Sequence, residues 1–329
     1  MCGTAGTARS DGPRLALIPP NDVNIRHPAV GNFSTFAQAI VSGIVTGSVY
    51  ALVALSLVIV YKATDVVNFA GGELVMVGGY LGLLALLWAD LPYAVMFVLV
   101  PLCAFLLGGL FNRFALERIG GRGHAKHVKL VPYVVATIAL SYILKGLVRV
   151  VPYTEEVRRM PPLFSGPPIF VGDIVLLRQD IAILVITMLV MVALWLFYGF
   201  TMTGRALRAT SQNARAAALL GIPVGLAKMS VWGLAAALAG IAGVLISPKL
   251  LMTPDMGSIV MFAFAAAIIG GFSSLPGCVV GGVLLGVVQN LVGLVSSQAI
   301  AVTPFFVIML VLLFRPQGFF DRTPTVKKV

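Results

Sequence analysis

No charged residue occurs in the stretch MGSIVMFAFAAAIIGGFSSLPGCVVGGVLLGVVQNLVGLVSSQAIAVTPFFVIMLVLLF, residues 256–314. One crossing of a lipid bilayer needs about 20 apolar residues, so this stretch is long enough for more than one crossing. SSLPG at 273–277 and Val302-Thr303-Pro304 interrupt it with residues that end helices. The stretch therefore divides into apolar segments at about 257–272, 278–296 and 299–314.

The composition of the whole chain is that of a membrane protein. Of its 329 residues, 59% are hydrophobic and only 11% are charged, whereas soluble domains carry about 25% charged residues. The formal charge of +11 is explained by loops that stay on the cytoplasmic side and face anionic lipid. We therefore expect contact with membrane lipid and no nucleic-acid partner.

Six further apolar segments precede the stretch, at about 36–60, 68–88, 92–112, 131–150, 181–200 and 229–248. Together they predict an all-α polytopic membrane protein with eight or nine apolar segments, in which 68–88 either crosses fully or is broken or re-entrant. The expected transmembrane domain covers 33–314. Residues 1–32, rich in Gly, Pro, Asp and Arg, are expected to be disordered and not to be a signal peptide.

The distribution of basic residues predicts which loops face the cytoplasm. Lys and Arg are dense at 113–129, at 201–229 and in the tail 315–329, which the segment count places on one side. The loop at about 151–180 mixes acids and bases and is placed outside. Nine full crossings put the N-terminus outside, and eight put it inside.

The polar loop TMTGRALRATSQNARAAALLGIPVGLAKM, residues 201–229, contains the signals of a short capped helix. Asn213 is suited to cap its start, because the side-chain oxygen can accept a free backbone N–H. Gly221 suits the left-handed position after the last turn, and Pro223 prevents continuation. Exposed Leu219 and Leu220 on such a helix favour docking into a groove of another protein. The alternative is a helix that folds back on the membrane surface.

A second informative stretch is Asn68-Phe69-Ala70-Gly71-Gly72-Glu73. A carboxylate at the start of an apolar helix is costly in lipid, so Glu73 is expected to face a cavity or a polar partner. Gly71 and Gly72 allow close approach of backbone to a ligand, and a helix that begins inside the protein presents its N–H groups to the pathway. The alternative places Glu73 at the headgroup level, where its charge suits the helix dipole.

A few uncharged polar residues lie within the expected membrane-spanning segments. Ser48, and Thr137 with Ser141 on one helix face, are candidates for lining a solute pathway. Such hydroxyls more often bond to their own helix backbone. Lys145 is expected to snorkel to the membrane surface, and Gln289 and Asn290 to join helices.

Several classes of chemistry lack their usual residues. No G-x-x-x-x-G-K-[ST], H-E-x-x-H or G-x-S-x-G occurs in the chain, and no row of carboxylates or histidines crosses the spans. The three cysteines, Cys2, Cys103 and Cys278, lie far apart. We therefore expect no catalytic residue, no metal site and no cofactor in this chain.

Five ordered motifs resemble those of one family, the Liv-type permeases of branched-chain amino-acid ABC importers. They are GSVYAL (47–52), VVNFAGGE (66–73), TGRALRATSQNARAAALLGI (203–222), AAAIIGGFSSLPGCVVGGVLLG (265–286) and RPQGFF (315–320). The chain departs from the family pattern at three places, one of which is Ser273, where the family has the glycine before the serine. Gly71 stands where many members have histidine, and Asn213-Ala214-Arg215 replaces an acidic-alanine start.

The resemblance implies a permease subunit of the bacterial inner membrane that moves branched-chain or other small neutral amino acids by alternating access. It implies a second permease subunit as a heterodimer partner, two cytoplasmic ATPase subunits that hydrolyse ATP, and an extracytoplasmic binding protein. It also implies that the ATPase contacts Arg205, Arg208, Ala214, Arg215, Ala218, Leu219, Leu220 and Gly221. The alternatives are a urea or short-amide permease of the same type and an ATP-independent carrier or channel.

Overall fold

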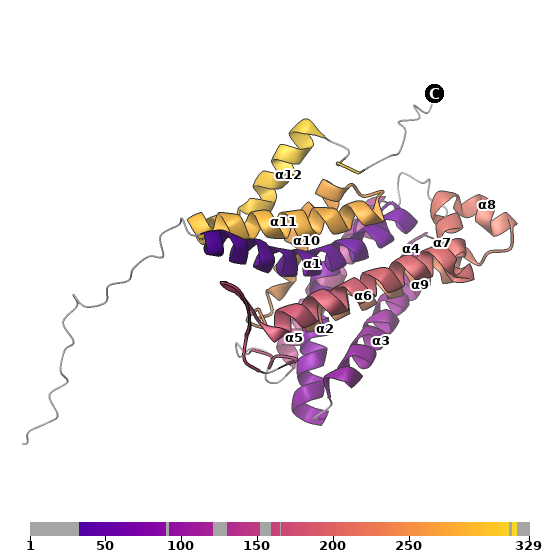
Figure 1. Cartoon of the computed structure of the whole chain (residues 1–329). Helices are drawn as coiled ribbons and strands as arrows, with labels where there is room; N and C mark the ends of the chain where they lie inside the picture. The colour runs from indigo at the N-terminus through magenta and orange to yellow at the C-terminus, as the bar shows by residue number, and fades with distance from the viewer. Residues whose placement is uncertain are drawn as a thin grey trace, which may run out of the picture.

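The computed structural model describes residues 33–89, 92–120, 130–151, 159–164, 166–315 and 318–320. The tail at 1–32, the part of the basic loop at 121–129 and the chain end at 321–329 lie outside these ranges, so the expectations for them stay predictions. Helices make up nearly all of the regular structure in the described ranges (Figure 1). The predicted all-α polytopic fold is confirmed.

The helices follow the apolar segments, with short helical turns between some of them. In chain order they are α1 Phe33–Thr64, α2 Gly71–Ala89, α3 Tyr93–Phe111, the π-helical turn Asn112–Leu116, α4 Glu117–Gly120, α5 Leu130–Val150, α6 Arg178–Phe200, α7 Met202–Gln212, α8 Ala214–Leu219, α9 Val224–Ile246, the 3-10 turn Met256–Ser258, α10 Ile259–Gly270, α11 Leu275–Val295, the 3-10 turn Gln298–Ile300 and α12 Thr303–Phe314.

Within the described ranges, seven helices are long and apolar enough to cross a membrane. The stretches Met256–Gly270 and Thr303–Phe314 are apolar but shorter, which accounts for the expected eight or nine segments. α2 is unbroken from Gly71 to Ala89, so segment 68–88 is not interrupted, although residues 68–70 precede the helix instead of belonging to it.

Small residues set the packing at the centre of the bundle. α1 and α11 run antiparallel, because Gly43 lies against Gly286 and Val287 while Gly47 lies against Gly282 and Val283. A Cβ added to Gly47 would come 2.6 Å from the Gly282 oxygen. Such contacts let backbones approach closely where lipid gives no hydrophobic drive for association. Gly43-x-x-x-Gly47 of α1 thus places its two small residues against α11.

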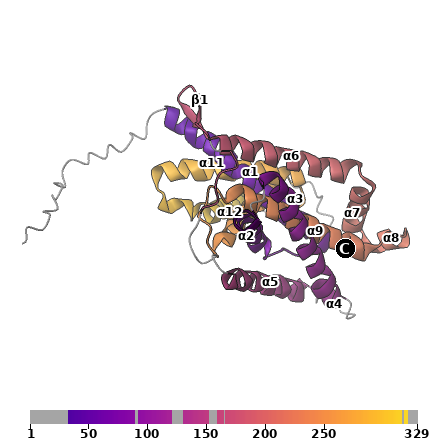
Figure 2. The same ribbon diagram turned by 90° about the horizontal axis from the view of Figure 1, so that it is seen from below.

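α9 is the second central helix. Gly243 of α9 lies against the Val75 oxygen of α2, and a Cβ added to Gly108 of α3 would come 2.5 Å from the Trp232 oxygen of α9. Of the apolar stretch that could cross the membrane, 89% is buried in α1 and 78% in α9, but only 22% in α5 and in α6. Seen from below, α6 and α5 lie at opposite edges with α1 and α9 between them (Figure 2).

The loop expected at 151–180 contains a β-hairpin that the sequence analysis did not predict. β1 Ile169–Val171 pairs antiparallel with β2 Ile174–Leu176 through a two-residue turn. Gly172 occupies the first turn position with a φ of 63°, which glycine adopts without strain. Gln38 of α1 pairs with the Val175 backbone through two hydrogen bonds of 2.9 Å and ties the hairpin to the start of α1. We call this the hairpin end, and the opposite end, with α7 and α8, the basic end.

Candidate functional site

The predicted capped helix is present at the basic end as α8. The Asn213 side-chain oxygen accepts hydrogen bonds of 3.1 Å from the Arg215 and Ala216 N–H groups. Gly221 follows the helix with a φ of 82°, and the Ile222 N–H returns to the Ala217 oxygen at 3.0 Å. Local cap chemistry therefore builds the helix as expected.

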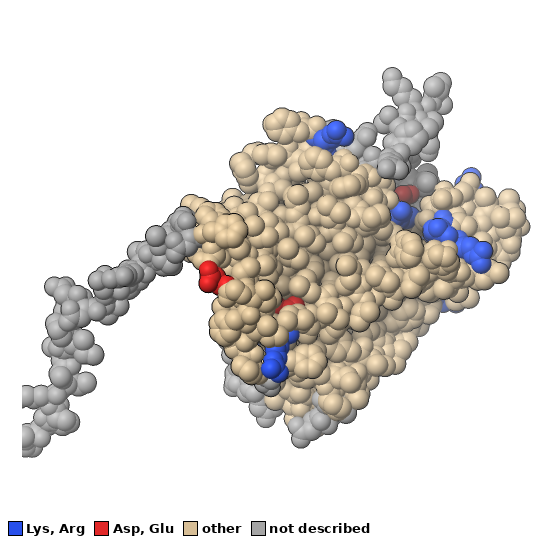
Figure 3. Space-filling view, in the orientation of Figure 1, with Lys and Arg blue, Asp and Glu red and all other residues tan. Residues whose placement is uncertain are grey.

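α8 is held by one buried residue and presents the others. Ala217 is 2% exposed, whereas Leu219 is 90% exposed and Leu220 is 80% exposed. α7, which the sequence analysis did not predict as a separate helix, brings exposed Arg205 and Arg208 to the same end, and Arg215 on α8 is also exposed. Figure 3 shows a group of basic side chains over α7 and α8, while acidic side chains are seen toward the opposite, left-hand side of that face.

The remaining residues expected at the ATPase contact lie on α8 or directly after it. Ala214 is half-buried, and Ala218 and Gly221 are exposed. The structure thus brings all eight predicted coupling residues into one segment, and the Leu219–Leu220 pair is its most exposed apolar part. We call residues 202–221 the basic-end segment.

The start of α2 lies inside the bundle. A Cβ added to Gly71 would come 2.8 Å from the Leu57 side chain of α1, and Leu57 precedes the end of α1 by seven residues, or roughly 10 Å at 1.5 Å per residue. A Cβ on Gly72 would overlap the Gly257 oxygen just before α10. The starts of α2 and α10 therefore meet in the interior, which supports the reading of a helix that begins inside the protein over the interfacial one.

Glu73 is 6% exposed and has a cationic partner that the sequence analysis missed. The Lys145 Nζ of α5 lies 3.7 Å from the Glu73 Oε1 and 3.6 Å from the Asp255 Oδ1. The Lys145 side chain is 30% exposed and lies between the buried Glu73 carboxylate and the exposed Asp255 carboxylate. Its expected reach toward the membrane surface stays a prediction, and the two counter-charges are what the sequence did not show. Glu73 Oε2 is buried without a hydrogen bond.

The other predicted pathway residues use their polar atoms locally. Ser48 donates to the Val45 oxygen at 2.7 Å, and Thr137 donates to the Val134 oxygen at 2.8 Å, each within its own helix. The Asn68 side-chain oxygen accepts the Ala70 N–H at 3.1 Å and so orders the turn that leads into α2. Ser141 is half-buried on α5. Of the seven predicted pathway residues, Glu73 lies near Lys145, while Gly71 and Gly72 lie against α1 and the residues at the start of α10. The other four, Ser48, Asn68, Thr137 and Ser141, are not brought into this contact by any interaction described above.

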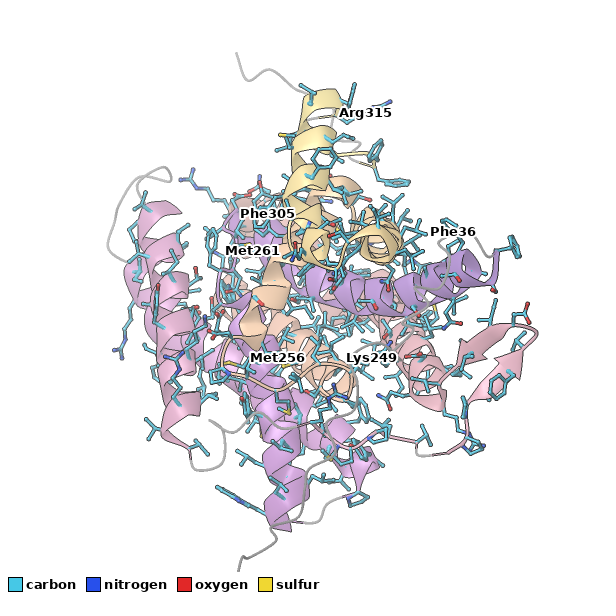
Figure 4. The ribbon with its side chains drawn as sticks, turned by 90° about the vertical axis from the view of Figure 1, so that its left-hand side faces the viewer. Phe36, Lys249, Met256, Met261, Phe305 and Arg315 are labelled. Atoms are coloured by element: carbon cyan, nitrogen blue, oxygen red, sulfur yellow. The ribbon has the colours of Figure 1, made fainter. Side chains whose placement is uncertain are left out.

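A groove of about 820 Å³ opens at the hairpin end. α1 contributes Gln38, Ser42, Thr46 and Tyr50, and α11 contributes Gln289 and Asn290. We call it the α1–α11 groove. Figure 4 looks onto this end, where Phe36 marks the first turns of α1 beside the strands and Lys249 lies in the loop after α9.

Sequence reasoning missed the α1–α11 groove, although its pattern is visible in the sequence. The four α1 residues recur every fourth position, which puts them on one helix face. Gln289 and Asn290, which were expected only to join helices, line the groove as well. What the pattern could not show is which face of α11 lies opposite.

A buried ion pair also fixes the hairpin end. Lys249 Nζ, after α9, lies 2.6 Å from the Asp180 Oδ1 in the first turn of α6, and both side chains are largely buried. In the described ranges no three His, Cys, Asp or Glu side chains group as metal ligands would.

Comparison with known proteins gives a consistent answer. Residues 39–314 match the family described as branched-chain amino acid transport system, permease component. The high-affinity branched-chain amino acid transport system permease protein BraD of Pseudomonas aeruginosa is 32% identical over 89% of this chain and 98% of its own. LivH of Salmonella typhimurium, described in the same words, is 31% identical over 90% of this chain and 99% of its own.

Among solved structures, PsaBC from Streptococcus pneumoniae in complex with Fab aligns with 87% of this chain and 94% of its own. The sequence identity is 16% and the TM-score is 0.44, a likeness on which no conclusion is based.

Proposed function

Because the chain belongs to the family of branched-chain amino acid transport permeases, we propose that it is the membrane-spanning subunit of an ATP-driven importer for branched-chain or other small neutral amino acids. It is a multi-pass membrane protein and a permease component. The proposed transport is alternating access in a bacterial inner membrane, and this chain performs no covalent chemistry.

The basic-end segment is the observation that carries the ATP coupling. A capped helix with Leu219 and Leu220 almost fully exposed, flanked by three arginines, is costly as a free surface and suited to a groove on a partner. We assign that partner as a cytoplasmic ATPase subunit. A second permease subunit, a second ATPase subunit and an extracytoplasmic binding protein complete the proposed importer.

The fold offers a mechanical route from α8 to the interior. Gly221 and Pro223 join α8 directly to α9, and α9 packs against α2 where Gly243 meets the Val75 oxygen. Movement of α8 with the ATPase would tilt α9 and with it the start of α2. The Glu73–Lys145 pair, shared with Asp255, is the proposed two-state element, because a single ammonium between two carboxylates can be rearranged by a small shift.

The predicted sidedness follows from the same assignment. If the basic-end segment is cytoplasmic, as its arginines indicate, α9 leads away from the cytoplasm. Lys249, Asp180 and the hairpin then lie on the outer side, where the binding protein delivers the solute.

Reconstitution tests the proposed function. The chain, its permease partner, the ATPase subunits and the binding protein are placed in liposomes, and uptake of labelled leucine and of labelled urea is measured with ATP, without ATP and without the ATPase. We expect leucine uptake only with ATP and ATPase together. Equal uptake without ATP would establish the carrier or channel, and uptake of urea in place of leucine would establish the amide permease.

A further inference from the structure

The α1 side of the α1–α11 groove is a polar stripe within an apolar helix. Gln38, Ser42, Thr46 and Tyr50 succeed one another at intervals of one helical turn. The groove reaches from Ser34 at the hairpin end to Tyr50, about 24 Å along the helix at 1.5 Å per residue. Ile40 and Ile44 lie on the opposite face of α1 and are 42% and 36% exposed. One face of α1 thus suits water and the other suits lipid.

The lining favours a solute without net charge. Ser42, Thr46 and Asn290 supply hydroxyl and amide groups, while Leu294 and Ile300 supply apolar surface. Among the described lining residues there is one charged side chain, Asp173, which is exposed on the hairpin at the mouth. A solute with net charge would find no counter-charge deeper in the groove, and an uncompensated charge at membrane depth is costly.

The deep end of the groove has an unmet hydrogen-bond acceptor. Gln289 is 8% exposed and its Oε1 is buried without a hydrogen bond, which costs free energy until a donor arrives. Asn290 donates its side-chain N–H to the Gly286 oxygen at 2.9 Å, so its carbonyl oxygen is left for a further partner. These amide oxygens match the N–H donors of an ammonium or amide group.

An aromatic pair closes the groove below these amides. The Gln289 side chain hydrogen-bonds Tyr50, so its amide already has one partner at the floor of the groove and its Oε1 remains. The Tyr50 ring stacks on Phe262 of α10 with centroids 5.1 Å apart and planes inclined by 11°. Tyr50 is buried. Since α10 begins beside Glu73, the floor of the groove belongs to the helix that meets the Glu73–Lys145 pair.

We propose that the α1–α11 groove is the entry site for the transported solute and that it binds a small zwitterion with an apolar side chain. The Gln289 and Asn290 oxygens accept the N–H groups of the solute, and the Ser42 hydroxyl donates to its carboxylate. Leu294 and Ile300 contact its apolar part. The Tyr50–Phe262 stack is the barrier that must open for onward movement. This inference rests on the proposed function. It places the first binding site for the solute in the α1–α11 groove, on the face of α1 opposite Ser48 and away from Glu73 on α2.

Thiol accessibility tests the groove in the complete transporter. The three cysteines are replaced by alanine, and Thr46→Cys or Ile44→Cys is then introduced. Intact cells are treated with a charged, membrane-impermeant methanethiosulfonate. Labelling at position 46 should be roughly tenfold faster or more, because a thiol in lipid stays protonated and only the thiolate reacts. Labelling at 46 should abolish leucine uptake, whereas treatment of the Ile44→Cys variant should leave it unchanged.

The ligand class is tested by protection. Labelling of Thr46→Cys is repeated during ATP turnover with empty binding protein, with leucine-loaded binding protein and with free urea. Slower labelling with leucine-loaded than with empty protein supports the groove as a zwitterion site. Equal rates, or protection by urea alone, would overturn the assigned ligand.

The outcomes separate this inference from the proposed function. ATP-dependent leucine uptake together with equal labelling at 44 and 46, or with none at either, refutes the groove and leaves the importer standing. Leucine uptake that no longer needs the ATPase refutes the proposed function, whatever the labelling shows.

Discussion

Single residues have the largest effect in the interior of the helix bundle, where a charge or a close helix contact has no water to compensate it. Glu73 is one example, because the half-buried Lys145 ammonium offsets part of the cost of burying its carboxylate. Gly72 is another, because its missing side chain is what allows the starts of α2 and α10 to meet. Both positions belong to the interior contact that we assign to the conformational switch.

Loss of one partner of the buried pair should cost more than loss of both. Lys145→Met leaves Glu73 buried beside apolar carbon, so we expect stability to fall by on the order of 2 kcal/mol. Glu73→Gln combined with Lys145→Met should recover much of that loss. Unfolding of the purified chain in detergent measures both, with Arg149→Met, an exposed cation one turn further along α5, as the control. Additive effects of the two changes would show that the pair is not coupled.

Even one methyl group at Gly72 should be harmful. Gly72→Ala places a Cβ onto the Gly257 oxygen, so α2 and α10 must separate, at a cost of about 1–3 kcal/mol. ATP-dependent uptake should fall sharply while membrane insertion persists. Gly146→Ala is the matched control, because a Cβ at that position meets no atom within 4 Å. Unchanged uptake by Gly72→Ala would remove this contact from the mechanism.

Among the helices, α8 shows most clearly which interactions lie within the chain and which need another protein. Its cap, its glycine turn and the buried Ala217 form it without a partner, yet its two leucines have none within the described chain. Such a helix forms without a partner, but the exposure of its leucines to water is unfavourable until another protein covers them. This combination is expected of a docking helix.

Leu220→Asp should uncouple ATP hydrolysis from transport. A carboxylate in place of the exposed leucine is tolerated by the free chain but not in an apolar groove on the ATPase. We expect normal membrane insertion, leucine uptake reduced at least tenfold, and weaker copurification of the ATPase. Leu177→Asp, the same substitution at an exposed leucine of the hairpin end, should leave leucine uptake and copurification of the ATPase unchanged. Coupled uptake at the normal rate by the Leu220→Asp variant would dissociate α8 from the ATPase.

At the scale of the whole molecule, the two ends differ in kind. One end has exposed arginines on α7 and α8, and the other has a hairpin, a buried Lys249–Asp180 pair and the mouth of the α1–α11 groove. The Gly-rich contacts of α1 with α11 and of α9 with α2 connect these ends through the centre. A rigid connection of this kind lets a movement at one end alter the other.

The two ends should face opposite compartments. In a variant without native cysteines, produced without the ATPase subunits that would cover the basic-end segment, Arg215→Cys should react with an impermeant thiol reagent only in inside-out vesicles. Asp173→Cys should react only in intact cells. The physical reason is the retention of basic loops in the cytoplasm. Reaction of both positions from the same side would overturn the proposed topology.

The sequence by itself determined the features that depend on neighbouring residues. Long uncharged runs require lipid, Asn213 caps the residues next to it, and Gly221 takes the conformation that ends a helix. The hairpin also depends on consecutive residues, because Gly172-Asp173 between two short runs rich in β-branched residues is a hairpin pattern, although it was not among the predictions. Each of these depends on a few consecutive residues, so a sequence is enough to find it.

Only the tertiary structure decided which distant residues meet. Nothing in the chain order pairs Glu73 with Lys145, places Gly72 on Gly257, or sets Gln289 opposite the polar face of α1. These contacts depend on how the helices rotate and cross, and that is fixed by glycine packing summed over the whole bundle. The helices could therefore be read from the sequence, whereas the solute groove and the buried charge pair arise from their assembly.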